Sequence, residues 1–201
     1  MPPEPTEREE VSWGCRAAFV GREPELAAIA VAFDRSLARS PQVVLLSGEA
    51  GIGKALTAEE SAARARGRSA LVLVGRCRER EGAPAFWPWV QIVRSVFEFA
   101  EREVLENDFR RLAPVLAQMI PEVADRFRDL ESAPQLEAEP VRFRLFDTVS
   151  VLLRRACSKQ AVVVLLDDLH RADPASLRLL GFVACELRDA RVLLLATSVA
   201  L

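Results

Sequence analysis

The sequence predicts an α/β protein with a doubly wound, mostly parallel sheet, and three observations support this fold class. Four short apolar runs, at 43–46, 71–74, 161–166 and 192–196, have the length and composition of buried parallel strands. Segments with apolar residues at helical spacing separate these runs. The chain has 201 residues, enough for one sizeable core. Strands that alternate with helices in this way are typical of a parallel sheet covered by helices.

The first ordered elements are predicted to be a helix, a strand and a second helix. Residues 1–18 are expected to form a flexible lead-in, because prolines and acidic residues are frequent there, and order should begin near Phe19. Pro24 suits the first turn of a helix. The apolar face of that helix comprises Leu26, Ile29, Ala30, Phe33 and Leu37. The strand at 43–46 follows, and residues 54–66, rich in Ala, Glu and Arg, form the next helix.

A long helical insertion is predicted between the second and third strands, over residues 78–160. Pro88 can open a helix there, and a later helix leads into the third strand. The apolar faces of these helices comprise Trp89, Ile92, Val93 and Val96 in the first, and Val141, Leu145, Val149, Leu152 and Ala156 in the second. Breaks are expected at Pro114, Pro121, Pro134 and Pro140. After the third strand, Asp173 and Pro174 mark a helix start, because Asp can cap free N–H groups and proline needs no donor there.

A glycine-rich loop between the first strand and the second helix is the first candidate site. It fits G-x-x-x-x-G-K and comprises Gly48, Glu49, Ala50, Gly51, Ile52, Gly53, Lys54 and Ala55. Phosphate oxygens must meet several backbone N–H groups at once, and glycines permit the tight path and close approach that this requires. Lys54 would supply positive charge to the outer phosphates. The alternative is a plain turn, but the strand, the spacing and the lysine together favour a phosphate site.

One residue of this loop departs from the usual pattern. Ser or Thr normally follows the lysine and gives a hydroxyl ligand to Mg²⁺, whereas Ala55 has no side-chain oxygen. Thr57 is no ready substitute, because two residues along a helix correspond to a rotation of about 200°. We therefore expect that water takes the missing position or that metal binding is weakened.

The second candidate site is the pair of carboxylates, Asp167 and Asp168, that ends the third strand. Like charges at the end of an apolar strand repel, so they must be solvated or matched by a cation. A magnesium–phosphate group would supply that match, with Asp167 as the metal-side acid and Asp168 orienting or activating the attacking water. The alternative is that both residues begin a solvated loop. The glycine-rich loop upstream favours a single site built from both motifs.

Four stretches of the chain resemble the ATPase domain of the STAND class of AAA+ proteins, which occurs in large MalT- and LuxR-type transcriptional regulators and is similar to origin-recognition-type ATPase domains. They are FVGREPELAAI (19–29), VLLSGEAGIGK (44–54), GRCREREGAPAFWPWVQIVR (75–94) and LLDDLHRADPASLRLL (165–180). The resemblance implies a three-layer P-loop NTPase core with strand order 1-4-3-2, ATP or ADP as ligand and Mg²⁺ as cofactor. It places an ATPase domain over residues 19–201.

The resemblance also implies roles for single residues. Three of them match the segment that lies against adenine and ribose: Val20, Gly21 and Arg22. Trp87 and Trp89 match an aromatic pair of the insertion, and by their chemistry alone they are core anchors. His170 matches a position just past the acidic pair, where a hydrogen-bonded structural role is favoured over that of a base.

Three departures from the family pattern bear on activity. Ala55 replaces Ser or Thr, Arg171 stands where Trp is usual, and Val199 occupies the place of an arginine that senses nucleotide. Relatives also continue into a fifth strand, a helical lid and a second sensor, so the chain is expected to be a fragment of a larger regulator or a degenerate copy. The strand at 43–46 would then be an exposed apolar edge, open to self-association or to a protein partner.

Composition limits the other possibilities. The net charge is −2, and without a basic block or a helix-turn-helix segment the sequence gives no case for DNA binding. The four cysteines are far apart and there is one histidine, which argues against a zinc site and predicts buried or partly buried thiols. No signal peptide is visible and no apolar run approaches the ~20 residues that span a bilayer, so we expect a cytoplasmic protein. Two hypotheses remain: a switch that hydrolyses ATP slowly, and a binding-only remnant that acts through protein contacts.

Overall fold

The computed structural model describes residues 21–77, 84–99, 112–126 and 138–200, and these form the predicted α/β fold. In chain order the elements are α1 (Glu23–Leu37), β1 (Gln42–Gly48), α2 (Lys54–Gly67), β2 (Leu71–Arg76), α3 (Trp87–Phe99), α5 (Glu122–Arg126), α6 (Ala138–Lys159), β3 (Val162–Asp167), the 3-10 turn η1 (Leu169–Arg171), α7 (Pro174–Glu186) and β4 (Val192–Val199). The last strand extends three residues beyond its predicted end at 196.

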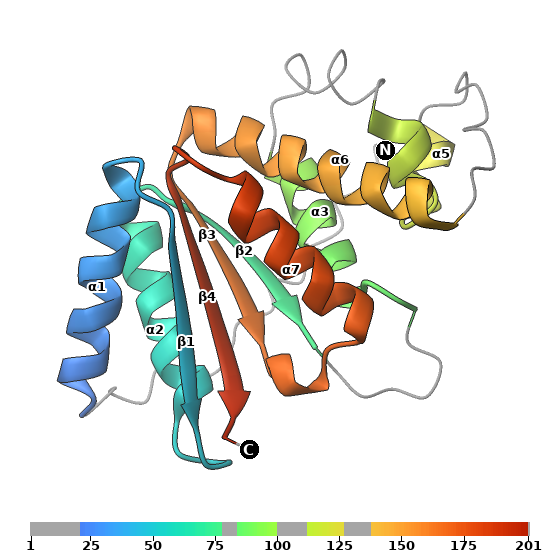
Figure 1. The fold of residues 1–201 in the computed structure, drawn as a ribbon. Coiled ribbons are helices and arrows are strands. Elements are labelled where there is room, and N and C mark those ends of the chain that lie inside the picture. Colours follow the sequence, from blue (N-terminus) through green and yellow to red (C-terminus); the bar gives the residue numbers. More distant parts are fainter. Residues whose placement is uncertain (1–20, 78–83, 100–111, 127–137, 201) are drawn as a thin grey trace, which may run out of the picture.

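The four strands form one parallel sheet in the order β1-β4-β3-β2, which confirms the predicted strand order. Helices α1 and α2 cover one face, and α3, α6 and α7 lie on the other, so the fold has three layers (Figure 1). Because all four strands run in one direction, their carboxyl ends lie at the same end of the sheet. The loops that follow β1 and β3 therefore lie there beside the end of β4, as ligand-binding loops do in open α/β sheets.

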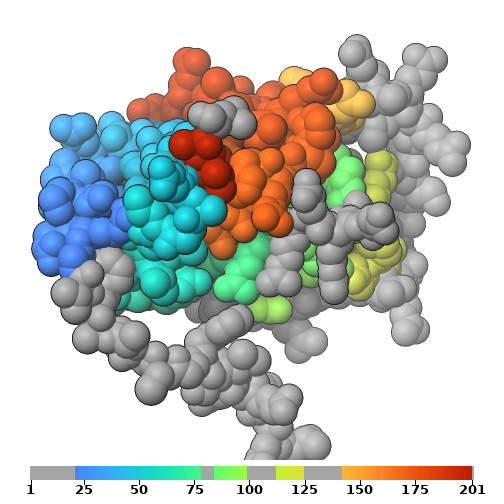
Figure 2. Space-filling view, turned by 90° about the horizontal axis from the view of Figure 1, so that it is seen from below, coloured from blue at the N-terminus to red at the C-terminus, as the bar shows by residue number. Residues whose placement is uncertain are grey.

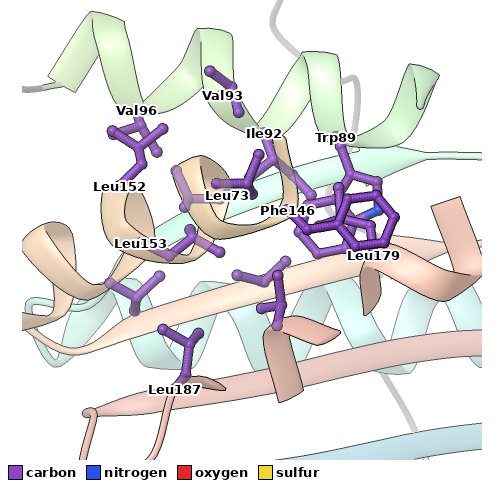
Figure 3. Close-up of a cluster of buried hydrophobic side chains, with 14 of the residues drawn as sticks. Leu73, Trp89, Ile92, Val93, Val96, Phe146, Leu152, Leu153, Leu179 and Leu187 are labelled. Carbon is purple, nitrogen blue, oxygen red and sulfur yellow. The ribbon is translucent and has the colours of Figure 1, made fainter. Parts of the chain in front are cut away.

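The larger core lies between the sheet and the helices α3, α6 and α7. Trp89 is fully buried in it, as predicted for a core anchor, and packs with Leu73 of β2, Phe146 of α6 and Leu179 of α7 (Figure 3). A second core on the opposite face joins α1 and α2 to the sheet. The central strand β3 contributes to both cores, which explains why its sequence is continuously apolar rather than alternating.

The first strand, β1, differs from β3 because it lies at the edge of the described sheet. Val44 and Leu46 face the helices α1 and α2, whereas Val43 is 61% and Leu45 is 55% exposed. The prediction of an exposed apolar strand at the sheet edge is thus confirmed for the described residues.

Two prolines of the insertion lie within the first turns of helices: Pro88, which was expected to open a helix, and Pro140, which was expected to break the chain. The first residue of α3 is Trp87, so Pro88 is the second. Similarly, α6 begins at Ala138, and Pro140 lies within its first turn instead of breaking the chain ahead of it. Proline is tolerated at both places, because N–H groups of the first turn have no acceptor within the helix.

The other predicted breaks have different outcomes. Pro114 lies among the helical residues 112–116, so the break predicted there is wrong, whereas Pro121 directly precedes α5. Pro134 and the predicted lead-in at 1–18 lie outside the described residues.

The cysteines and the helices bear on two further expectations. Cys77 and Cys157 are buried as expected, but Cys185 is exposed on α7, so the prediction for that thiol is wrong. Within the described ranges, none of the helices combines the length and the apolar character needed to cross a bilayer.

Candidate functional site

The glycine-rich loop connects β1 to α2 at the carboxyl end of the sheet. Gly51 and Gly53 have φ angles of 78° and 91°, in the left-handed region that glycine enters without the steric cost of a side chain. Figure 2 views this end of the molecule, with the loop in cyan beside the red end of β4 and the orange residues that follow β3. The two glycines thus stand where the chain has to turn sharply into α2.

The N-terminus of α2 has the features of an anion site. No side chain caps it, and its first turn contains no acidic residue. Within the loop Ile52 N donates to Glu49 O at 3.5 Å, and the first N–H group of α2 that is bonded back is that of Thr57, which donates to Gly53 O at 3.0 Å. The N–H groups at the start of the helix, from Lys54 to Leu56, precede the first bond of α2 and are therefore suited to a ligand. Helix α7 is different, because the Asp173 carboxylate already accepts from Ala175 N and Ser176 N. A helix of 14 residues with an uncapped positive end is suited to phosphate oxygens.

The ammonium group of Lys54 is held against this loop by two of its carbonyl groups. Lys54 Nζ lies 2.9 Å from Gly48 O and 2.6 Å from Glu49 O. Gly48 O also accepts from Ala200 N at 3.1 Å, which ties the end of β4 to the start of the loop. Since an ammonium has three protons to donate, a phosphate oxygen could replace one or both carbonyls without moving the lysine backbone.

Arg22 also contacts the glycine-rich loop. Its guanidinium donates to the carbonyl of Ile52 and lies 3.3 Å from the Glu25 carboxylate. Its backbone is left-handed, with φ of 59°, and Gly21 before it has φ of 89°. The structure therefore brings Gly21 and Arg22 to the loop, while Val20 lies outside the described residues. Their contact with adenine and ribose stays a prediction.

The two carboxylates Asp167 and Asp168 follow the central strand β3, beside the end of β4. Asp167 Oδ1 accepts from Thr197 Oγ1 at 2.6 Å, and Thr197 Oγ1 itself accepts from Asp168 N at 2.9 Å. Asp168 has a φ of 56°, a conformation that side chains other than glycine adopt infrequently. One hydroxyl therefore orients the first carboxylate and fixes the backbone of the second.

Thr197 is the site residue that the sequence interpretation missed. It is 1% exposed and belongs to β4, beyond the predicted end of that strand. A signal was present, because a hydroxyl that directly follows an apolar run in a central strand will be buried and will need partners. Finding those partners required the register of the two strands, which pairs Leu166 with Ala196 and so brings Thr197 beside Asp167.

Two more residues near the end of β4 lie as the sequence suggested. His170 Nδ1 accepts from Val199 N at 3.3 Å, so this histidine is hydrogen-bonded to the strand, as a structural residue would be. Val199 ends β4 with an aliphatic side chain, which carries no charge.

The residues fit Mg²⁺ only together with phosphate and water. Ala55 has no oxygen to offer, and Thr57 does not replace it, because Thr57 is fully buried and its hydroxyl donates to Gly53 O at 3.0 Å. Within the described ranges, no three His, Cys, Asp or Glu side chains come together as a metal site. Asp167 would be the single protein ligand, which is consistent with a cation that prefers phosphate oxygens and retained waters.

Cys77 follows β2 and lies near the carboxylates. Its N–H donates to Asp167 O at 2.9 Å. Burial, followed by the negative charges of Asp167, Asp168 and Asp173, raises the pKa of the thiol from 9.0 to about 12. The thiol is therefore held in its protonated form at neutral pH.

Comparison with known proteins bears on the fold and on nucleotide binding. The family described as AAA ATPase domain matches residues 18–195. An uncharacterized protein of Rhizobium meliloti (strain 1021) is 27% identical over 196 residues, which are 90% of this chain and 18% of that protein. Among solved structures, PCH-2 of C. elegans aligns with a TM-score of 0.43 and 16% identity, over 88% of this chain and 37% of the other.

The family match covers most of the chain, whereas the chain spans less than a fifth of the Rhizobium relative. The glycine-rich loop, the uncapped start of α2 and the two carboxylates all fall within the matched residues. This chain is thus a nucleotide-binding module that belongs to the AAA ATPase domain family.

Proposed function

We propose that this module is the nucleotide switch of a signal-transducing or transcriptional regulator of the STAND type, which binds ATP or ADP and hydrolyses ATP slowly or not at all. The observation that carries the proposal is the uncapped, acid-free N-terminus of α2, with Lys54 held against the loop in front of it. The greater length of the Rhizobium relative supports a place within a larger protein. The four stretches that resemble MalT- and LuxR-type regulators support the signalling role.

The residues of the loop would bind the phosphates. Backbone N–H groups between Gly48 and Ala55 would donate to phosphate oxygens, and Lys54 would neutralise the outer phosphates. Gly21 and Arg22, together with Val20, would lie against adenine and ribose. This assignment uses the left-handed turns at Gly51 and Gly53, where glycine lets the backbone approach a phosphate closely.

The two carboxylates would complete the site. Asp167 would hold Mg²⁺ directly or through water, using the oxygen that Thr197 leaves free. Asp168 would orient or activate the attacking water. Bound Mg²⁺ supplies positive charge that stabilises the transferring phosphoryl group.

Two residues argue for slow hydrolysis and keep a second function open. Ala55 removes one protein ligand of Mg²⁺, and Val199 removes a cation from the end of β4. The second function is therefore that of a binding-only remnant, which holds nucleotide without turnover and acts through contacts with a protein partner or with another copy.

Nucleotide affinity and turnover distinguish the two functions. Affinity is measured with and without Mg²⁺, and steady-state hydrolysis with Mg²⁺, for the original chain and for Ala55→Thr. Turnover that is abolished by Asp168→Asn would support the switch. Binding without turnover, with turnover gained in Ala55→Thr, would support the remnant. If the original chain has no measurable nucleotide affinity in Mg²⁺ and Lys54→Ala does not change this result, both functions are excluded.

A further inference from the structure

Asp173 stands where the loop after the carboxylates, helix α7 and the helical insertion meet. Only η1, Ala172 and Asp173 itself lie between Asp168 and Pro174. Hydrogen bonds close this turn, from Arg171 N to Asp168 O at 2.8 Å and from Ala172 N to Leu169 O at 3.1 Å. The segment between Asp168 and Asp173 is therefore short and internally bonded.

The Asp173 carboxylate accepts four hydrogen bonds, and one of them leaves its own helix. Oδ1 accepts from Ala175 N at 3.1 Å and Ser176 N at 2.9 Å, and Oδ2 accepts from Ser176 Oγ at 2.5 Å. These three bonds cap α7. The fourth runs from Phe86 N to Oδ2 at 3.2 Å and joins residues 87 positions apart in the sequence. A helix cap needs only the first three, so the fourth connects the cap to the insertion.

Phe86 donates this fourth hydrogen bond, and it adjoins two helices of the insertion, α3 and α6. It immediately precedes α3, and its backbone has φ of 65°, which is unfavourable for a bulky residue unless the surroundings hold it. Its ring packs edge-to-face on Phe146 of α6, with centroids 5.9 Å apart. The hydrogen bond from Phe86 N to Asp173 therefore holds Phe86, which precedes α3 and packs on α6, in place.

A second contact joins α3 to α7 one turn further along. Trp89 Nε1 donates to Ser176 O at 3.1 Å, and the indole is fully buried. Figure 3 shows Trp89, Phe146 and Leu179 side by side, one from each of the helices α3, α6 and α7. The start of the insertion is thus packed against the first turns of α7, the helix that Asp173 caps.

The insertion is also fastened to the sheet beside the carboxylates. Gln91 Nε2 donates to Arg76 O at 3.1 Å, and Gln91 Oε1 accepts from Arg76 N at 3.4 Å. Arg76 is the register partner of Asp167 in the adjacent strand. These bonds hold α3 to β2, and the bond between Phe86 N and Asp173 joins the loop after Asp168 to the residue that directly precedes the same helix.

We propose that Asp173 is a positioning residue that couples the carboxylate pair to the helical insertion, so that nucleotide binding changes the stability of α3. This inference rests on the proposed function, because it needs a nucleotide next to Asp168. Any shift of Asp168 passes through the bonded turn η1 to Asp173. Asp173 cannot move without stretching its bond to Phe86, whose ring rests on α6.

Hydrogen exchange with and without nucleotide tests the coupling. ATP in Mg²⁺, or a non-hydrolysable analogue, should slow amide exchange in α3 of the original chain. Asp173→Asn keeps one carbonyl oxygen for the cap of α7, but its NH₂ group cannot accept from Phe86 N. In this variant the nucleotide affinity should stay within about threefold of the original. Nucleotide should, however, no longer slow amide exchange in α3.

Ser176→Ala is the matched control. It removes one of the local bonds to Asp173, leaves the bond from Phe86 intact and retains the carbonyl that accepts from Trp89. In this variant nucleotide should slow amide exchange in α3 as much as in the original chain. If Asp173→Asn does not give a folded protein by thermal melting, Asp173→Ser replaces it, because serine caps a helix but is too short to reach Phe86.

The outcomes separate this inference from the proposed function. An original chain that does not bind nucleotide overturns the proposed function and this inference with it. Binding that leaves exchange in α3 unchanged overturns the inference alone. The inference is also overturned if nucleotide slows amide exchange in α3 equally in the original chain and in the folded Asp173 variant, because the coupling would then not depend on this carboxylate.

Discussion

At the scale of single residues, Lys54 offers a direct test of the phosphate site, because Lys54 and Lys159 are the only lysines in the sequence. Lys54 lies against the glycine-rich loop, whereas Lys159 ends α6, away from that loop. We expect ATP to slow acylation of Lys54 several-fold, since bound phosphates would cover its ammonium group. Lys159 is the internal control, and mass spectrometry measures both sites. If saturating ATP leaves the acylation rate of Lys54 unchanged, the assignment of Lys54 to the phosphate site is contradicted.

Thr197 makes a different prediction, because its hydroxyl bonds to both carboxylate residues. Thr197→Val keeps the shape of the side chain but leaves Asp168 N without its partner and removes the donor to Asp167. An unpaired buried group costs about 1–3 kcal/mol, so the free energy of unfolding should fall by about that amount in chemical denaturation. Thr197→Ser retains the hydroxyl and serves as the control. The prediction fails if both variants unfold at the same denaturant concentration.

The buried thiols predict how stability changes in alkali. Burial raises the pKa of Cys77 and of Cys157 from 9.0 to about 12 in the folded chain, and in Cys157 the charge of Arg191 opposes part of this rise. Above pH 9 the unfolded chain therefore binds fewer protons than the folded one, so stability present below pH 9 is lost as the pH rises toward 12.

Denaturation at several pH values tests this loss. The sequence has no tyrosine and only two lysines, so few other groups titrate in the same window. Cys77→Ala should lose less of its free energy of unfolding between pH 9 and 11 than the original chain does. Parallel losses in the two proteins would show that Cys77 does not contribute.

At the scale of elements, the close approach of α3 to β2 depends on Gly75. A Cβ atom there would lie 2.5 Å from Pro88 O, a backbone atom that cannot move without the helix. Gly75→Ala should therefore destabilise the chain by about 1–3 kcal/mol, as overpacking does. Gly181→Ala in α7 is the matched control, since nothing lies within 4 Å of its added Cβ, and alanine should stabilise that helix by about 0.5–1 kcal/mol. Thermal melting compares the two.

The same elements show what a sequence can and cannot predict. The strands, the starts of α2 and α7, and the glycine-rich loop were predictable, because periodicity and caps are local patterns. The strand order came from the resemblance to a known family. The bonds of Thr197 to Asp167 and of Phe86 to Asp173 were not predicted, because they join residues far apart in the chain. Arg22 was matched to the segment that lies against adenine and ribose, and its contact with the glycine-rich loop was not predicted.

At the scale of the whole molecule, the proposed site is built from segments that the fold brings together at one end of the sheet. The glycine-rich loop and the carboxylates are separated by more than half of the chain, and β4 lies between them. The end of β4 is hydrogen-bonded to the glycine-rich loop, through Ala200 N to Gly48 O, and to the two carboxylate residues, through Thr197. The site therefore exists only in the folded sheet, and variants that disturb β4 should affect both halves together.

The exposed strand β1 predicts how the chain behaves in solution. Val43 and Leu45 present apolar side chains at the edge of the described sheet, where the backbone groups of β1 can pair with another strand (Figure 1). We expect the 201-residue chain to self-associate as its concentration rises, and the double substitution Val43→Lys with Leu45→Lys to reduce this, because charge on an edge strand opposes pairing. Light scattering measures both. Val31→Lys is the control, since Val31 is 51% exposed but lies on α1 and offers no strand to pair. A monomeric original chain at every concentration would show that this edge does not drive association.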